Sequence, residues 1–297
     1  MKKIFFLATI LFLLSALHAS EKSGGKVFIS VDMEGIWGVV HGDQTSPESA
    51  EYGPARKWMA EDVNAVITGL LEAGVTEIVV NDSHGSMRNI LASDLNPKAI
   101  LISGSPKPLS MMQGIDGSFH ACLLIGYHAK AGTTSAILDH TISGSTVHAI
   151  RINGLEMPEL GINSAIAGYF DVPVIMLSGD KEVCSQAQSL LGKELVTIAV
   201  KEATGRYAAK LVPMEEARRL LREGAKEAIL KRAAVKPFKL TPPYKFEVEF
   251  ANSGQADLAE LIPQAKRTDA RTVTFTSNDY LEGFKLMRAL IALASYR

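Results

Sequence analysis

Short apolar runs recur along the first two-thirds of the chain, and each is followed by polar residues or by glycine. The runs are rich in β-branched and aromatic side chains, a pattern typical of buried strands. They occupy residues 27–35, 76–80, 99–102, 121–126, 147–152 and 172–177.

Segments with helical periodicity separate several of these runs. In residues 54–73, Pro54 suits the first turn of a helix, apolar residues recur at helical spacing, and Gly74 follows the last of them. Helices are also expected over residues 159–169 and 181–191. Because strands alternate with helices, we predict an α/β fold with a mainly parallel sheet flanked by helices.

The pattern changes from about residue 195. A strand over residues 195–200 is followed by a long charged helix over residues 213–233. Further elements are expected at residues 245–250, 273–276 and 279–295. We therefore predict an α/β metal-binding domain over residues 21–194 and a smaller α+β portion over residues 195–297, with an inserted second domain as the alternative.

Residues 1–20 have the features of a secretory signal peptide. Lys2 and Lys3 precede an apolar stretch over residues 4–17, and cleavage is expected after Ala19 or Ser20. The apolar stretch is shorter than the roughly 18 residues of a membrane span. We therefore predict a protein exported to a bacterial periplasm, without a stable membrane anchor.

Charge and cysteine usage narrow the class of protein. Lysine and arginine total 31, aspartate and glutamate total 32, and no basic stretch resembles a nucleic-acid footprint, so no nucleic-acid partner is expected. An exported chain can hold a disulfide. Here, however, Cys122 lies in an apolar run and Cys184 in an expected helix, so both are predicted to be buried free thiols.

Candidate metal ligands follow three separate strands. Asp32 and Glu34 are two residues apart at the end of the first run, so both side chains point to the same side of the strand. His84 and His128 each follow another strand. Ligands bind at the carboxyl ends of strands in open α/β sheets, so these side chains are expected to meet there. The full set of candidates is Asp32, Glu34, His84, His128, His140 and Glu159.

Each of these residues has an ordinary structural alternative. A histidine at a strand end is commonly a hydrogen-bonded structural residue, and Glu159 suits the N-terminus of a helix. Their recurrence at strand ends favours a site, because carboxylates held close together repel unless a cation lies between them. Imidazoles and carboxylates without thiolates suit catalytic zinc, with manganese or cobalt as alternatives. The set exceeds what one open zinc site needs, so we predict two metal ions about 3.5–4 Å apart.

Five short motifs are spread along the chain: Ser30-Val-Asp-Met-Glu-Gly35, Asn81-Asp-Ser-His84, Gly126-Tyr-His-Ala129, Glu159-Leu-Gly-Ile-Asn163 and Phe250-Ala-Asn-Ser-Gly-Gln255. They resemble the motifs of the bacterial zinc-dependent D-aminopeptidases associated with dipeptide-transport operons. They occur in the same order as in that family, and the resemblance covers nearly the whole chain from about Lys26. Trp37 stands where a small residue is usual, and this departure is expected to reshape the substrate pocket.

The resemblance implies a role for each candidate. Asp32 matches the ligand that bridges two zinc ions, and His140 matches the catalytic histidine, which is sometimes given as the nucleophile. The remaining ligands match Glu34, His84, His128 and Glu159. The resemblance also implies homo-oligomers, in the form of ring-shaped decamers that enclose the active sites in a channel.

The expected activity is that of a metallo-aminopeptidase, a hydrolase that releases N-terminal residues from short peptides. A hydroxide held by two zinc ions is expected to attack, with His140 as general base, general acid or oxyanion stabiliser. Selectivity for D-amino acids is implied by the resemblance alone. The alternatives are a binuclear hydrolase of other amides or of phosphate esters, and a non-catalytic exported peptide-binding protein.

Overall fold

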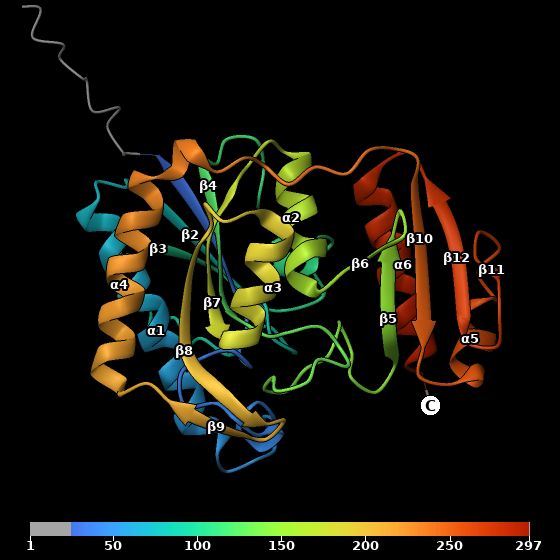
Figure 1. Cartoon of the computed structure of the whole chain (residues 1–297), viewed down its shortest axis with the longest axis horizontal. Coiled ribbons are helices and arrows are strands. Elements are labelled where there is room, and N and C mark those ends of the chain that lie inside the picture. The colour runs from blue at the N-terminus through green and yellow to red at the C-terminus, as the bar shows by residue number, and fades with distance from the viewer. Residues whose placement is uncertain (1–24, 297) are drawn as a thin grey trace, which may run out of the picture.

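A computed structural model describes residues 25–296 of the protein and shows two β-sheets side by side (Figure 1). The larger sheet is parallel except for its last strand, β9, which runs antiparallel to β8. In spatial order its strands are β3 (Ala99–Ile102), β2 (Glu77–Asp82), β1 (Lys26–Val31), β4 (Ala121–Tyr127), β7 (Val174–Asp180), β8 (Val196–Gly205) and β9 (Ala208–Leu211).

Helices cover both faces of the larger sheet. Helices α1 (Tyr52–Glu72) and α4 (Met214–Leu230) lie on one face, and α2 (Glu159–Tyr169) and α3 (Lys181–Leu191) lie on the other. Alternate side chains of β1 enter different apolar clusters, so that Ile29 packs with the first pair of helices and Phe28 with the second. Burial on both faces explains why β1 and β4 are apolar throughout instead of alternating.

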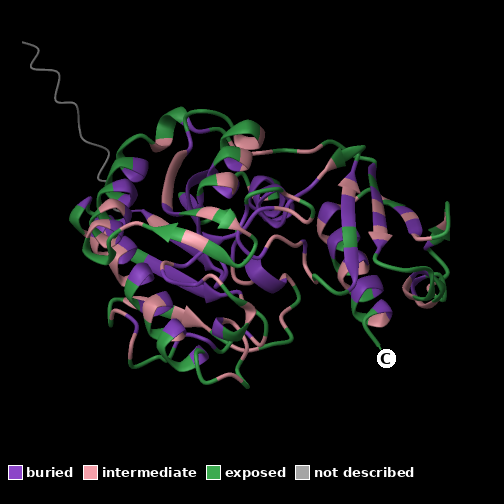
Figure 2. Ribbon diagram, turned by 60° about the horizontal axis from the view of Figure 1, so that its bottom comes forward, coloured by how far each residue is buried: buried purple, intermediate pink, exposed green. Residues whose placement is uncertain are grey.

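The smaller sheet is antiparallel and carries two helices of its own, α5 (Ser253–Ala259) and α6 (Tyr280–Ala294). Its strands, in spatial order, are β11 (Lys266–Arg267), β12 (Thr272–Ser277), β10 (Tyr244–Phe250), β5 (Val147–Ile152) and β6 (Leu155–Glu156). The hydroxyl of Tyr280 in α6 donates to the carbonyl of Ile162 in α2 (3.0 Å), which joins the two sheets through their helices. Figure 2 shows buried residues in the strands and on the helix faces that cover them.

The predicted α/β class is confirmed, since the chain has a mostly parallel sheet flanked by helices and a second, antiparallel sheet. The two sheets, however, do not divide at residue 194. Strands β5 and β6 precede that position but belong to the smaller sheet, while β8 and α4 follow it and belong to the larger one. The smaller sheet therefore contains strands that precede β7 and β8 in the sequence as well as strands that follow them.

Three other sequence predictions concern single segments. The expected signal peptide lies outside the described residues. Within residues 25–296, no helix has the length and apolar character needed to cross a bilayer. Cys122 and Cys184 are buried free thiols, as predicted. Helix α5 was not among the elements predicted from the sequence; Asn252 and Gln255 cap it reciprocally.

The close contact between α1 and α4 yields a testable prediction. A Cβ atom added to Gly69 in α1 would lie 2.0 Å from the carbonyl oxygen of Arg222 in α4. Alanine normally favours a helix interior over glycine by about 1 kcal/mol. We expect Gly69→Ala instead to destabilise the protein, lowering the free energy of unfolding by about 1–3 kcal/mol, because the two helices must move apart.

The matched control is Gly53→Ala in the first turn of the same helix, where an added Cβ meets nothing within 4 Å. We expect this control to be neutral or stabilising by up to about 1 kcal/mol. Chemical denaturation of both variants measures the difference. Equal effects at the two positions would show that the close approach of the helices does not constrain Gly69.

Candidate metal centre

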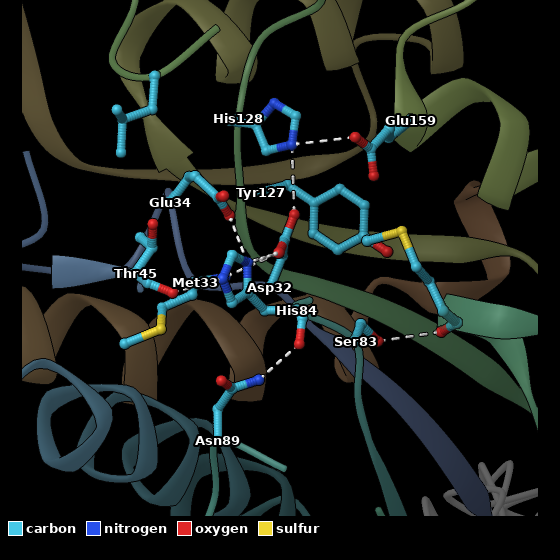
Figure 3. Close-up of polar contacts among 12 residues, drawn as sticks. Asp32, Met33, Glu34, Thr45, Ser83, His84, Asn89, Tyr127, His128 and Glu159 are labelled. Carbon is cyan, nitrogen blue, oxygen red and sulfur yellow. Dashed lines mark hydrogen bonds and ion pairs between the residues drawn. The ribbon is translucent and has the colours of Figure 1, made fainter. Parts of the chain in front are cut away.

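Three neighbouring strands bring the predicted ligands to one edge of the larger sheet. Strand β1 pairs in parallel with both β2 and β4, so the carboxyl ends of the three strands lie next to each other. Asp32 and Glu34 follow β1, His84 follows β2, and His128 follows β4. Glu159 is the first residue of α2 and reaches the same place (Figure 3). The structure therefore brings together all five residues predicted as metal ligands.

The carboxylate of Asp32 lies between the two histidines. Its Oδ1 is 3.3 Å from Nδ1 of His84, and its Oδ2 is 3.4 Å from Nε2 of His128. Beyond these histidines stand the other two acids: Glu34 is 3.0 Å from His84, and Glu159 is 3.3 Å from His128. A carboxylate with one oxygen toward each histidine suits a bridging ligand.

The outer nitrogen of each imidazole faces a backbone carbonyl oxygen. Nε2 of His84 is 3.0 Å from the oxygen of Thr45, and Nδ1 of His128 is 3.0 Å from that of Ala129. A carbonyl can only accept, so each of these ring nitrogens carries the hydrogen and donates. Such bonds to the outer nitrogen fix the tautomer and turn the other nitrogen, with its lone pair, toward the site.

Whether a metal ion fits the site can be judged from the buried nitrogen and oxygen atoms that face one another there. Nε2 of His128 is buried and has no hydrogen-bond partner among the described residues, although Asp32 and Glu159 both lie beside it. Lone pairs of imidazole and carboxylate then face one another at 3.0–3.4 Å, which is unfavourable unless a cation lies between them. The donor set is nitrogen and oxygen without sulfur, which fits zinc.

His140 stands beside these residues and was predicted to lie outside the ligand set. Its ring stacks on that of His128, with centroids 3.8 Å apart and an angle of 12° between the planes. Nδ1 is 2.9 Å from the carbonyl oxygen of Leu138, and Nε2 is 3.6 Å from Oε1 of Glu159. One potential ligand atom from each of His128, His140 and Glu159 lies within 4.8 Å of the others, as do those of Asp32, Glu34 and His128.

The pKa values of the carboxylates and imidazoles in the site also indicate that the cluster needs positive charge. Burial, and then the charge of Glu34, raise the pKa of Asp32. Burial alone would raise the pKa of Glu159 too, but the charge and hydrogen bond of His128, the charge of His140 and the amide of Ile142 together outweigh it and lower that pKa to about 2. Burial would lower the pKa of His128, yet Glu159 and Asp32 hold it well above its usual range. In the absence of a metal, protons on the imidazoles supply the missing charge.

A buried hydrogen-bond network lies among the strands that carry the ligands. The hydroxyl of Tyr127 is 2.7 Å from that of Ser30, which is 2.8 Å from the hydroxyl of Ser83. Asn163 of α2 donates to the same Tyr127 hydroxyl (2.9 Å). These four side chains connect β1, β4, α2 and the residue that follows β2, so they fix the relative positions of the elements that hold the ligands.

Gly35 allows two of these elements to approach closely. Its amide donates to the carbonyl of Gly126 (2.7 Å), and an added Cβ would lie 2.0 Å from the carbonyl oxygen of Tyr127. A larger residue would therefore push the chain that carries Glu34 away from the end of β4, where His128 follows. The glycine in the first motif is needed for this contact.

Lys201, which sequence analysis missed, supports the same turn from the far side. It lies in β8, is fully buried, and donates to the carbonyl oxygens of Glu34 (2.6 Å), Ile36 (2.8 Å) and Val39. Burial lowers the pKa of Lys201 to about 7. The one available signal was a lysine directly after an apolar strand run, which by itself is common on exposed strand ends.

The site opens into a cavity of about 160 Å³. Its lining includes Asp32, Glu34, His84, His140 and Glu159, together with Met87, Met111, Ile142 and, from α6, Arg288. Trp37 does not line this cavity, so the expectation that it reshapes the pocket is not met. Its ring packs edge-on against Trp58, and its indole nitrogen donates to the carbonyl of Val212 (2.7 Å).

Comparison with known proteins gives three consistent results. The sequence profile of the D-aminopeptidase family matches residues 26–289. A D-aminopeptidase of Bacillus subtilis (strain 168) is 39% identical over 272 residues, which cover 91% of this chain and 97% of that protein. The structure of the Zn-dependent D-aminopeptidase DppA from Bacillus subtilis, described as a self-compartmentalizing protease, superposes with a TM-score of 0.88 at 36% identity, covering 92% of this chain and all of that one.

The contacts of Lys201 yield a prediction. Lys201→Met keeps most of the side-chain length but removes the ammonium donor that three buried carbonyl oxygens share. We expect the free energy of unfolding to fall by about 3 kcal/mol, as measured by chemical denaturation. The control is Lys210→Met, an exposed lysine on the neighbouring strand β9, with an expected change within about 0.5 kcal/mol. An unchanged stability for Lys201→Met would contradict its supporting role.

Proposed function

The chain belongs to the D-aminopeptidase family, and from this premise we propose that it is a zinc-dependent aminopeptidase that releases N-terminal D-amino acids from short peptides. The observation that carries the proposal is the buried Nε2 of His128, which faces two carboxylates without a hydrogen bond. A peptide-binding protein without catalytic function has no need of such an arrangement.

Two zinc ions per chain are proposed, because the ligand atoms form two groups. Asp32, whose oxygens face different histidines, would be shared between the ions. Glu34 and His84 would complete one group, and His128 and Glu159 the other. When bound, the zinc ions supply positive charge that polarises the scissile carbonyl and lowers the pKa of bound water.

His140 is proposed to move the proton. Its Nδ1 donates to the carbonyl of Leu138, so the lone pair of Nε2 faces Glu159 at the wall of the cavity. From there Nε2 takes a proton from the attacking water and delivers it to the nitrogen of the leaving amine. Attack by the imidazole itself would need a covalent intermediate that hydrolysis by water avoids.

Two further properties are proposed from different grounds. Export to the periplasm rests on the charged and apolar pattern of residues 1–20, and fractionation of cells that express the full chain tests it. Assembly into closed homo-oligomers, a decameric ring in the family resemblance, is supported by the self-compartmentalizing relative. Sedimentation of the purified protein tests that assembly.

Zinc content and stereochemistry together test the proposed activity. We expect about two zinc ions per chain by mass spectrometry and hydrolysis of D-alanine p-nitroanilide at least about tenfold faster than of its L-isomer. Asp32→Asn should lose zinc and most activity, while Asp43→Asn, an exposed acid in the following loop, should lose neither. Hydrolysis of p-nitrophenyl phosphate in place of both anilides would point to the phosphate-ester alternative and contradict the proposal.

The role of His140 is tested by His140→Ala. We expect this variant to keep both zinc ions and to lose about 10²- to 10⁴-fold in kcat, because the proton no longer has a carrier. His148→Ala is the control, since His148 is an exposed histidine on β5. Loss of a zinc ion from His140→Ala would instead make His140 a ligand, and full turnover would exclude it from the mechanism.

A further inference from the structure

One charged side chain at the cavity has no partner. Arg288 belongs to α6, the helix of the smaller sheet, and it lines the same cavity as Asp32 and Glu159. Within residues 25–296 its guanidinium makes no hydrogen bond or ion pair. Among the arginines whose side chains are described, the only other one without such a contact is Arg88, which is exposed on the surface. The partly buried Arg288 therefore differs from the rest.

The acids of the cavity do not serve as its partners. Oε1 of Glu159 accepts a hydrogen bond from the amide of Ile142 (2.6 Å) and lies beside the imidazoles of His128 and His140. No oxygen of Glu159 lies within ion-pair distance of Arg288. Asp32 and Glu34 are engaged with the histidines. The site thus holds three carboxylates that lie beside histidines. Its one guanidinium has none of these carboxylates within ion-pair distance.

A guanidinium in this position is suited to a particular ligand. Burial lowers the pKa of Arg288, but an arginine keeps its charge at neutral pH. Its planar set of donors matches a carboxylate through two parallel hydrogen bonds. A partly desolvated charge gains more from such a partner than one in water does. The partner that suits the Arg288 guanidinium is therefore an anionic group that enters the cavity with the substrate.

The residues that line the cavity show where this anion lies relative to the scissile bond. An extended chain advances about 3.3–3.6 Å per residue, so two residues span about 7 Å. The cavity has a volume of about 160 Å³, and Arg288 lines it together with the predicted ligands Asp32 and Glu159. A short peptide whose scissile bond lies at these ligands can therefore reach Arg288 with its own C-terminal carboxylate.

We propose that Arg288 binds the C-terminal carboxylate of the substrate and that the enzyme therefore prefers short peptides with a free carboxylate to the same peptides with a blocked one. This inference rests on the proposed aminopeptidase function and adds the carboxylate subsite to it. Since α6 belongs to the smaller sheet, one sheet presents the hydrolytic residues and the other recognises the end of the substrate.

The test compares two substrates that share a scissile bond. D-Alanylglycine and D-alanylglycine amide both release D-alanine, and they differ only in the carboxylate. For the wild-type enzyme we expect kcat/KM to be about 10- to 100-fold higher for the free acid, chiefly through KM. Arg288→Met should reduce this ratio to about one and leave kcat/KM for the amide within about twofold. Arg288→Lys should restore part of the preference.

Lys285→Met is the matched control, because Lys285 is an exposed cation on the same helix and pairs with Glu282. It should keep the wild-type ratio. Equal kcat/KM for the two peptides in the wild type would overturn the carboxylate subsite while leaving the proposed function intact. An equal loss on acid and amide in a folded Arg288→Met, with a wild-type melting temperature, would also overturn it and assign Arg288 to the transition state. Release of D-alanine from neither peptide would overturn the proposed function itself.

Discussion

The constraint on which the rest of the structure depends is the mutual repulsion of acceptor groups in one small space. Three carboxylates meet imidazoles at 3.0–3.4 Å, and the outer nitrogens that face backbone carbonyls direct the inner lone pairs at those carboxylates. Such a cluster is unstable without positive charge, whether protons or metal ions provide it. The protein must therefore hold these groups in place by contacts outside the cluster.

Those outer contacts come from every layer of the fold. Adjacent parallel strands place Asp32, His84 and His128 side by side. The close approach at Gly35 and the three carbonyl bonds of Lys201 define the path of the turn that carries Glu34. The hydroxyl network around Tyr127 connects these strands to α2, which begins with Glu159. Rigid support of this kind is what lets repelling groups stay close enough to share cations.

The features that could be predicted from the sequence are local ones. Apolar runs mark the strands, and a polar residue directly after a buried strand lies at the sheet edge, so Asp32, His84 and His128 could be placed without coordinates. Lys201 and Arg288 could not, because the residues that surround them in the fold lie far away in the sequence and a cation beside an apolar segment usually faces water. The sequence does contain one indication that Arg288 is partly buried, since it stands four residues after Phe284 on the apolar side of α6. The membership of β5 in the second sheet likewise depends on pairing with β10, almost a hundred residues later.

Anomalous diffraction at the zinc absorption edge, from crystals of the purified protein, tests the central claim most directly. The account predicts two zinc peaks about 3.5–4 Å apart, with Asp32 between them, Glu34 and His84 at one and His128 and Glu159 at the other. Zinc bound elsewhere, or a zinc-free site in which protonated His84 and His128 pair with the carboxylates in active enzyme, would contradict it.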